Sequence, residues 1–218
     1  MADPAKPLAV LLAGGRNTRY GAPKALAEIG GRTILDRGLA ALETAVGTDA
    51  VIVANDSGPY RPSGRTIRPD VRPGTGVLGG ILTAVTWARE LDRDGALVLA
   101  CDMPFVPPAL LRRLVDEASP DGIAVPASRG PRGLEPLCAV YGIGCADAIG
   151  AALDRGERTI ISFFDDVDVH ELPLEEVERF GPVDRIFFNV NRPEEHRRAE
   201  RLAATAPGEP EEKDEEAR

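Results

Sequence analysis

The chain has 218 residues, of which 43% are hydrophobic and 28% are charged, enough apolar residues for one sizeable core. Its formal net charge of −9 argues against nucleic acid as a partner, because that binding depends on a basic surface that neutralises phosphates. The three cysteines form no C-x-x-C pair and the two histidines are far apart, which argues against a zinc site or a disulfide framework.

The first predicted element is a buried strand over residues 8–12, LAVLL, which leads into a loop rich in glycine and basic residues. A continuous apolar run suits a strand covered on both faces in a mainly parallel sheet, and open sheets of this class bind ligands at the carboxyl ends of their strands. Gly14 and Gly15 lack Cβ atoms, so the backbone can approach a polyphosphate closely. The phosphate charge would be offset by the basic residues of the loop, Arg16, Arg19 and Lys24. The loop therefore predicts a site for a nucleoside triphosphate.

Two other phosphate-binding motifs fit this chain less well. A P-loop requires lysine and then a hydroxyl residue directly after its second glycine, whereas Lys24 follows Gly21 by three residues and has alanine after it. The dinucleotide fingerprint G-x-G-x-x-G occurs as GTGVLG at residues 74–79, but prolines just before it deny the strand that the fingerprint needs. A dinucleotide-dependent oxidoreductase and a plain surface turn are the weaker alternatives.

Residues 33–54 predict a helix followed by the second buried strand. Apolar residues recur with helical spacing, at Leu35, Leu39, Leu42 and Val46. Thr33 and Asp36 have the form of a capping box at the start of this helix. The strand, AVIVA at residues 50–54, ends at Asn55, which is either a ligand-side residue or a turn former.

Residues 59–73 are rich in proline, glycine and arginine and predict a loop with one short strand, at residues 66–68, before Asp70. A carboxylate here can accept hydrogen bonds from the donor groups of a ligand, although aspartate is also a common turn residue. Residues 74–80 then predict a loop entering a helix whose first amides are free. The buried side of that helix is expected to consist of Leu78, Ile81, Leu82, Val85 and Ala88.

The most strand-like run, GALVLAC at residues 95–101, delivers Asp102 to the carboxyl edge of the sheet. Magnesium prefers hard oxygen ligands, usually one or two carboxylates completed by phosphates and water, so Asp102 predicts a Mg²⁺ site. The alternative, that Asp102 caps the next helix, fits poorly because that helix begins near Pro107.

The second half of the chain continues to alternate strand and helix patterns. The patterns predict strands over residues 123–126, 167–172 and 185–190, and helices over residues 143–153 and from Pro193 onward. His170 is expected to be exposed on an edge strand, and Asn191 either caps the last helix or faces the ligand. The whole alternation predicts a three-layer α/β fold with helices on both faces of the sheet.

The loop L-A-G-G-x-x-x-R-Y-G-x-x-K at residues 12–24 resembles the signature loop of the nucleotidyltransferases that activate sugars and cofactors. Within that superfamily, the order of the later motifs resembles the molybdenum cofactor guanylyltransferase family. These motifs are Asp70, the glycines of residues 76–80, C-D-M-P at 101–104, E-P-L-x-A-x-Y at 135–141 and N-V-N-R-P-E-E at 189–195. The chain departs from the family pattern at Tyr20, where the family usually carries methionine, and at Val77, where it usually carries proline.

The resemblance implies a Rossmann-like nucleotidyltransferase fold with a mainly parallel, mixed central sheet. It implies transfer of GMP from GTP to the phosphate of molybdopterin or the molybdenum cofactor, with Mg²⁺ as the cofactor and pyrophosphate as the leaving group. An acceptor molybdoenzyme or its chaperone is a further expected partner. A cytidylyltransferase for the same cofactor, a sugar-phosphate nucleotidyltransferase and a non-catalytic nucleotide-binding regulator are the remaining alternatives.

The resemblance also implies roles for individual residues. The expected catalytic residues are Arg19, Lys24 and Asp102, with Asp102 as the metal ligand. The expected nucleotide-binding residues are Leu12, Ala13, Gly14, Gly15, Lys24, Asn55, Asp70, Gly80 and Asp102. The acceptor is expected to contact Glu135, Asn189 and Asn191, with Arg129 and Arg132 as candidate contacts to its phosphate or its pterin end.

The ends of the chain are expected to lie outside the folded domain, which we place at residues 8–204. Residues 1–7 and 205–218 are expected to be disordered tails, and the last eleven residues carry six acids and two bases. Nothing in the sequence resembles a signal peptide, and no run of about 18 apolar residues occurs. The sequence therefore predicts a cytoplasmic protein with no membrane-spanning segment.

Overall fold

The computed structural model describes residues 6–14 and 24–205, and its central feature is a seven-stranded sheet. The strands follow the order β5-β4-β1-β6-β8-β7-β9 across the sheet. Their bounds are β1 (Leu8–Leu12), β4 (Val51–Val53), β5 (Ile67–Arg68), β6 (Gly95–Ala100), β7 (Gly122–Pro126), β8 (Cys138–Gly142) and β9 (Asp168–Leu172). Strand β8 runs antiparallel to β6 and β7, whereas the other strand pairs of this sheet are parallel. The predicted mainly parallel, mixed sheet is confirmed.

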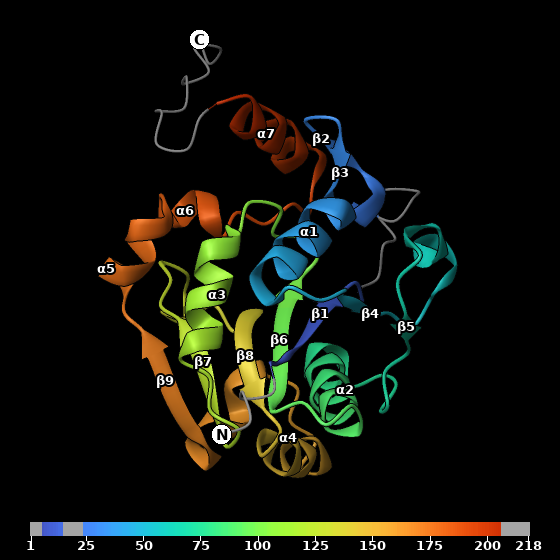
Figure 1. Cartoon of the computed structure of the whole chain (residues 1–218), viewed down its shortest axis with the longest axis vertical. Helices are drawn as coiled ribbons and strands as arrows, with labels where there is room; N and C mark the ends of the chain where they lie inside the picture. Colours follow the sequence, from blue (N-terminus) through green and yellow to red (C-terminus); the bar gives the residue numbers. More distant parts are fainter. Residues whose placement is uncertain (1–5, 15–23, 206–218) are drawn as a thin grey trace.

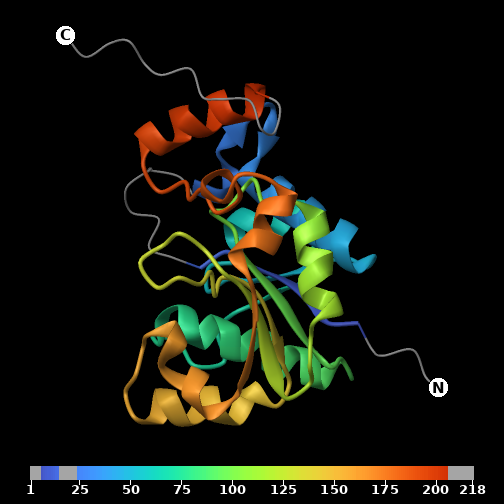
Figure 2. The same ribbon diagram turned by 90° about the vertical axis from the view of Figure 1, so that its left-hand side faces the viewer.

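Four helices cover the two faces of the sheet. Helices α1 (Ile34–Val46) and α3 (Pro108–Asp116) lie on one side, and α2 (Gly76–Glu90) and α4 (Cys145–Asp154) lie on the other (Figure 2). Alternate residues of β1 pack into the two layers, with Leu11 on the α1 side and Val10 on the α2 side. All five residues of β1 are buried, which explains why the strand has a continuous apolar sequence.

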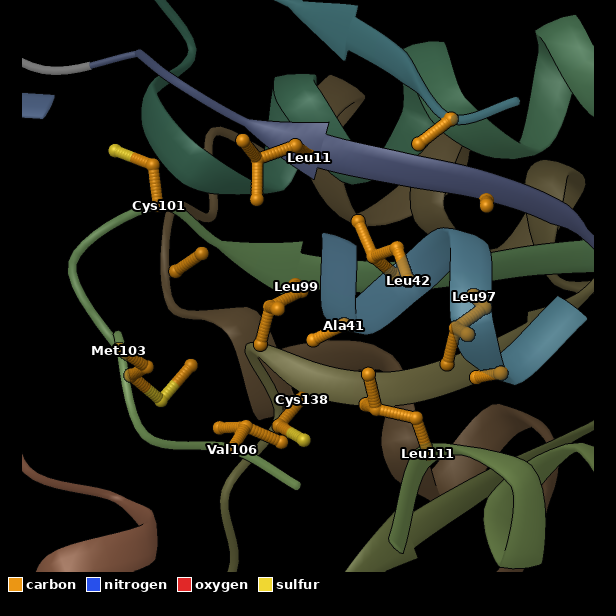
Figure 3. Close-up of a cluster of buried hydrophobic side chains, with 14 of the residues drawn as sticks. Leu11, Ala41, Leu42, Leu97, Leu99, Cys101, Met103, Val106, Leu111 and Cys138 are labelled. Atoms are coloured by element: carbon orange, nitrogen blue, oxygen red, sulfur yellow. The ribbon is translucent and has the colours of Figure 1, made fainter. Parts of the chain in front are cut away.

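The core on the α1 side is tightly packed around β1 (Figure 3). Leu11 of β1 and Leu99 of β6 belong to the same cluster as Leu42 of α1 and Leu111 of α3. Helix α1 lies so close to the sheet that a Cβ atom at Gly38 would stand 2.7 Å from the Leu11 Cδ1 atom. This close approach packs β1 directly against α1.

The ends of α1 and α2 agree with the sequence patterns. The Thr33 side chain accepts a hydrogen bond from the Asp36 backbone N–H at 3.0 Å, as expected for an N-cap. Helix α2 begins at Gly76 without a side-chain cap from Thr75, so its first amides are free of such a partner. Because β5 ends at Arg68, no strand directly precedes the glycine string at residues 74–79, and the dinucleotide fingerprint lacks its required context.

A third cluster joins the C-terminal helix α7 (Pro193–Ala204) to the hairpin of β2 (Glu28–Ile29) and β3 (Arg32–Thr33), at the top of Figure 1. Its buried residues are Ile29, Ile34, Phe188, Val190, Ala199 and Leu202. The segment that leads into α7 crosses the sheet edge, where the Val190 N–H donates to the Asp102 carbonyl oxygen at 2.9 Å. This cluster therefore brings the end of the chain against residues that follow β6.

The predicted strand at residues 185–190 is wrong, because this segment contains the short helix α6 (Val183–Ile186) and then irregular backbone. The Phe187 N–H donates to the Val183 carbonyl at 3.0 Å, which closes a helical turn. The apolar side chains do not alternate across a sheet, since Phe187 packs into the α1-side core and Phe188 into the α7 cluster. The remaining short elements are η1 (Lys24–Leu26), η2 (Gly58–Ser63), η3 (Ile160–Asp166), α5 (Leu174–Val177) and η4 (Glu178–Phe180).

The predicted edge strand at residues 167–172 is confirmed as β9, which pairs with β7 at one end of the sheet. His170 is exposed, as expected, and its Nε2 atom lies 3.0 Å from a Glu117 carboxylate oxygen. Within the described part of the chain, no helix has both the length and the apolar character needed to cross a membrane.

Candidate active site

The residues predicted to bind the nucleotide follow the carboxyl ends of four parallel strands. Gly14 follows β1, Asn55 follows β4, Asp70 follows β5 and Asp102 follows β6. Since parallel strands all end at the same edge of a sheet, the fold brings these four residues to one side of the molecule. The predicted loop residues Gly15, Arg16 and Arg19 lie outside the described residues.

Lys24 connects three distant parts of the chain. Its ammonium group donates to Asp102 Oδ2 at 2.8 Å and to Asn191 Oδ1 at 2.7 Å. The side chains of Lys24 and Asp102 are each only 21% exposed, so this ion pair is partly shielded from water. The Lys24 ammonium group thus contacts both Asp102, the other predicted catalytic residue, and Asn191, a predicted acceptor-binding residue.

Asp102 has an oxygen that no described residue satisfies. Its Oδ1 atom is buried and has no hydrogen-bond partner, while Oδ2 is held by Lys24. A buried, unpaired carboxylate oxygen at a ligand-binding edge fits a cation that is held partly by the substrate. No group of three or more metal-binding side chains occurs among residues 6–14 and 24–205. A single carboxylate such as that of Asp102 suits Mg²⁺, which commonly uses one or two carboxylates and takes its other ligands from phosphates and water.

The sequence left open whether Asp102 caps α3 and whether Asn191 caps α7. In the structure a different residue occupies each N-cap position. The N-cap of α3 is Pro107, so Asp102 does not cap that helix. The N-cap of α7 is Arg192, whose backbone N–H donates to the Glu195 carboxylate at 2.9 Å. The side chain of Asn191 is therefore directed to Lys24 instead of to the helix end.

Asn55 and Asp70 form a reciprocal pair beside the start of α2. The Asn55 Nδ2 group donates to Asp70 Oδ2 at 2.7 Å, and the Asp70 backbone N–H donates to Asn55 Oδ1 at 3.0 Å. Gly80 lies next to this pair, because a Cβ atom built on it would stand 3.7 Å from Asp70 Oδ1 and 3.6 Å from the Leu12 side chain. Four of the predicted nucleotide-binding residues are therefore close together in space.

Tyr60 supports the backbone directly after β1, a role that no sequence motif predicted. Its hydroxyl donates to the carbonyl oxygen of Ala13 at 3.0 Å, and the Ala13 N–H donates to the Val53 carbonyl at 3.0 Å. Tyr60 is buried, with 3% of its surface exposed. An aromatic residue inside the otherwise proline-rich segment 59–73 was the only sequence signal for this role.

A cavity of about 650 Å³ opens between the loop after β7 and the segment from α6 to α7. Glu135 and Asn189, two of the predicted acceptor residues, line it together with Arg129. The Arg129 guanidinium donates to the Glu178 carboxylate at 2.7 Å, so it is engaged within the protein. Arg132 is exposed and is not among the residues that line the cavity.

Two titratable groups lie near Asp102, the half-buried Glu135 and the buried Cys101. Burial raises the pKa of the Glu135 carboxyl to about 7, an effect opposed by the Leu137 N–H and reinforced by the charge of Asp102. Burial likewise raises the pKa of the Cys101 thiol to about 12, with a further contribution from the charge of Asp102. Cys101 is therefore a neutral core residue at physiological pH and not a nucleophile.

The raised pKa of Glu135 predicts a pH-dependent stability that Glu135→Gln should remove. In the unfolded chain a glutamate has a pKa of about 4.3, so the folded state binds its proton more tightly. This contribution to stability is fully present below the unfolded value and is lost as the pH rises through about 7. We expect the free energy of unfolding of wild type to fall from pH 5 to pH 8 more steeply than that of Glu135→Gln. Urea titrations at pH 5, 6 and 8 measure this, and parallel pH curves for the two proteins would contradict it.

Comparison with known proteins relates the chain to nucleotidyltransferases. A family model described as a MobA-like NTP transferase domain matches residues 9–172. A probable molybdenum cofactor guanylyltransferase from Pelotomaculum thermopropionicum is 35% identical over 184 residues, which cover 84% of this chain and 87% of that protein. The matched range of the family model includes the seven strands of the sheet apart from Leu8, the first residue of β1, and ends before α7.

Two solved structures are similar in fold. The molybdopterin-guanine dinucleotide biosynthesis protein A from Archaeoglobus fulgidus has a TM-score of 0.72 and 27% identity, covering 90% of this chain and 98% of that one. The 2-C-methyl-D-erythritol 4-phosphate cytidylyltransferase from Thermus thermophilus has a TM-score of 0.65 and 21% identity, covering 91% and 100%. At 21% identity the second match shows the shared fold alone. The fold by itself therefore does not show which nucleotide base the chain binds.

Proposed function

Because the chain belongs to the family of MobA-like NTP transferase domains and is a nucleotidyltransferase, we propose that it is a molybdenum cofactor guanylyltransferase. The reaction would move GMP from GTP to the phosphate of molybdopterin or of the molybdenum cofactor and release pyrophosphate. The observation that carries the proposal is the convergence of Lys24, Asp102 and Asn191 at the end of β6. In the strand order of the sheet, β4 and β5, which precede the Asn55–Asp70 pair, lie on one side of β6, and β7, which precedes the cavity, lies on the other. A nucleotide and an acceptor can thus approach the same charged centre from two sides.

The charges of the site suit phosphoryl chemistry. Lys24 would move from Asp102 to the phosphates of the bound nucleotide and stabilise the negative charge that develops on the leaving pyrophosphate. Asp102, whose Oδ1 atom has no partner among the described residues, would hold Mg²⁺. Bound there, Mg²⁺ would supply charge neutralisation at the triphosphate. Arg19, outside the described residues, is proposed as a second positive charge on the phosphates.

The bond changes require no side-chain base. An oxygen of the acceptor phosphate attacks the α-phosphorus of GTP in line, and the bond from the α-phosphorus to the bridging oxygen of the β-phosphate breaks. A phosphate nucleophile is already ionised near neutral pH, so positioning and electrostatics supply the catalysis. The cavity lined by Glu135 and Asn189 would hold the acceptor, with Asn191 near its phosphate.

We expect GTP to bind at least ~10-fold more tightly than CTP, a difference of about 1.4 kcal/mol. A site that hydrogen-bonds one base leaves its polar groups unpaired with the wrong base, and in this proposal the Asp70 carboxylate accepts from guanine. Calorimetric titration with each nucleotide measures the difference. Equal or tighter binding of CTP would contradict the predicted preference for guanine and would favour the cytidylyltransferase alternative. A cytidylyltransferase with another substrate shares the fold of this chain.

The experiment that tests the whole proposal is an assay of pyrophosphate release with GTP, CTP, ATP and UTP, each with and without molybdopterin. We expect release only when GTP and molybdopterin are both present, with the guanine dinucleotide detected by mass spectrometry. Release that depends on a sugar phosphate instead of molybdopterin would overturn the acceptor assignment. Binding of GTP with no release in any mixture would overturn the enzymatic one.

A further inference from the structure

We propose that Arg198 of α7, stacked on Phe188, forms a platform that binds the flat ring system of the acceptor. The inference deepens the proposed function and rests on it, since the acceptor proposed above carries a pterin, a flat bicyclic heteroaromatic ring. Neither residue belongs to a motif on which the resemblance to the family rests, and both follow residues 9–172, the range that the family model matches. The Phe188–Arg198 platform thus gives a binding role to residues that the family motifs leave without one.

The ring of Phe188 is held in place by packing. Phe188 is 9% exposed and belongs to the cluster that joins α7 to the β2–β3 hairpin. The ring of Phe105 packs against it, with the two ring centroids 6.4 Å apart and the ring planes tilted by 52°. A nearly buried ring that packs against a second ring has little freedom to turn. Because Phe188 also lines the cavity, it forms a rigid part of the cavity wall.

The guanidinium group of Arg198 lies over the face of that ring. Its Cζ atom is 5.0 Å from the centroid of the Phe188 ring, within the range of a cation–π contact. Arg198 is exposed and lines the same cavity. A guanidinium group is flat and has two faces, so one that rests on an aromatic ring can present its other face to a second flat group. The stack therefore suits a planar heteroaromatic ligand.

The cavity joins this stack to the proposed reaction centre. Its lining includes Glu195, whose carboxylate accepts from the Asn191 backbone N–H, while the Asn191 side chain accepts from Lys24. Arg198 is the sixth residue of α7, about 8 Å along the helix axis from Pro193. In Figure 2, α7 (red) lies above the loop between β7 and β8 (yellow), which forms the facing wall. An acceptor whose phosphate lies near Asn191 can therefore extend along the cavity and place its ring on Arg198.

Simple attraction between charges is the competing explanation. Arg201 lies one helical turn after Arg198 and lines the same cavity, so two positive charges would attract an anionic acceptor wherever its ring lies. Lysine keeps a positive charge but has no planar face on which a ring can stack. Arg198→Lys therefore separates the two explanations. If the ring stacks on the platform, lysine does not replace arginine.

Titration with a stable analogue of the acceptor, 6-hydroxymethylpterin phosphate, tests the platform without turnover. Quenching of the pterin fluorescence gives its Kd for wild type, Arg198→Ala and Arg198→Lys. We expect both substitutions to raise this Kd by roughly tenfold, because both remove the stacking face. The Kd for GTP should stay within about twofold, since the predicted nucleotide-binding loops follow β1, β4 and β5, on the other side of β6 from the cavity. Thermal melts establish that the variants are folded.

Arg197→Ala is the matched control, because Arg197 is the neighbouring residue on α7, is also exposed and is not among the residues that line the cavity. We expect its Kd for the pterin analogue to stay within about twofold of wild type. Wild-type affinity in Arg198→Lys would show that charge alone attracts the acceptor and would overturn the platform. Undetectable binding of the analogue by wild type would overturn it as well.

Steady-state kinetics separate this inference from the proposed function. With pyrophosphate release as the signal, we expect Arg198→Lys to raise the KM for molybdopterin by roughly tenfold and to leave the KM for GTP unchanged. An unchanged KM for molybdopterin in an active Arg198→Lys variant would overturn the platform alone. Pyrophosphate release by wild type that does not depend on molybdopterin would overturn the proposed function, and the platform with it.

Discussion

Asp102→Asn is expected to lower Mg²⁺-dependent turnover by roughly 100-fold or more while the protein stays folded. The substitution keeps the size of the side chain but removes its negative charge and one of its oxygens. The buried Oδ1 atom, which has no partner among the described residues, is the oxygen best placed to meet the metal. GTP should still bind, because Lys24 and the glycines after β1 are proposed to contact its phosphates independently of this carboxylate.

The measurement for Asp102→Asn is the initial rate as a function of Mg²⁺ concentration, alongside thermal melts of both proteins. A second readout is direct binding of Mn²⁺ by electron paramagnetic resonance in the presence of GTP, which does not require turnover. Asp116→Asn is a suitable control, since Asp116 lies at the end of α3 and outside the site. A normal rate with unchanged Mg²⁺ dependence would remove Asp102 from the active site, and the proposed mechanism with it.

Lys24→Ala is expected to lose roughly 2 to 4 kcal/mol of transition-state stabilisation, a drop of about 30- to 1000-fold in kcat/KM. The structure places its ammonium group between Asp102 and Asn191, where the phosphates and the acceptor would meet. A single preorganised donor commonly contributes this much when charge develops in a shielded site. Initial rates over a range of GTP and molybdopterin concentrations separate the loss in binding from the loss in turnover.

Lys6→Ala provides the control for Lys24→Ala. Lys6 donates to the carbonyl of Val46 at the end of α1, at 3.2 Å, and takes no part in the site. We expect its kcat/KM to stay within about twofold of wild type. If Lys24→Ala retained the wild-type rate, the loop after β1 would not be the catalytic one.

Local sequence patterns predicted much of the fold. Continuous apolar runs identified β1 and β6, and helical spacing identified α1 and α2, because these elements bury their side chains against neighbours at regular intervals. Alternation of the two kinds of element implied a mainly parallel sheet, and with it the common edge that carries Asn55, Asp70 and Asp102. The prediction was wrong at residues 185–190, where an apolar run indicated a strand. The apolar side chains of this segment pack into two different cores and do not alternate across a sheet.

Only the tertiary structure decided which of these residues meet. Lys24 reaches Asn191 because α7 packs against the β2–β3 hairpin. These segments are so far apart in sequence that the spacing of apolar residues does not predict their contact. The support of Ala13 by Tyr60 likewise depends on where an irregular loop folds back. The raised pKa of Glu135 follows from burial beside Asp102, which no local pattern specifies. The sequence by itself thus determined the strands, the helices and the edge to which the polar residues are delivered, since these depend on local spacing. Which of these polar side chains contact each other at that edge depends on the packing of the whole chain, so only the tertiary structure decides it.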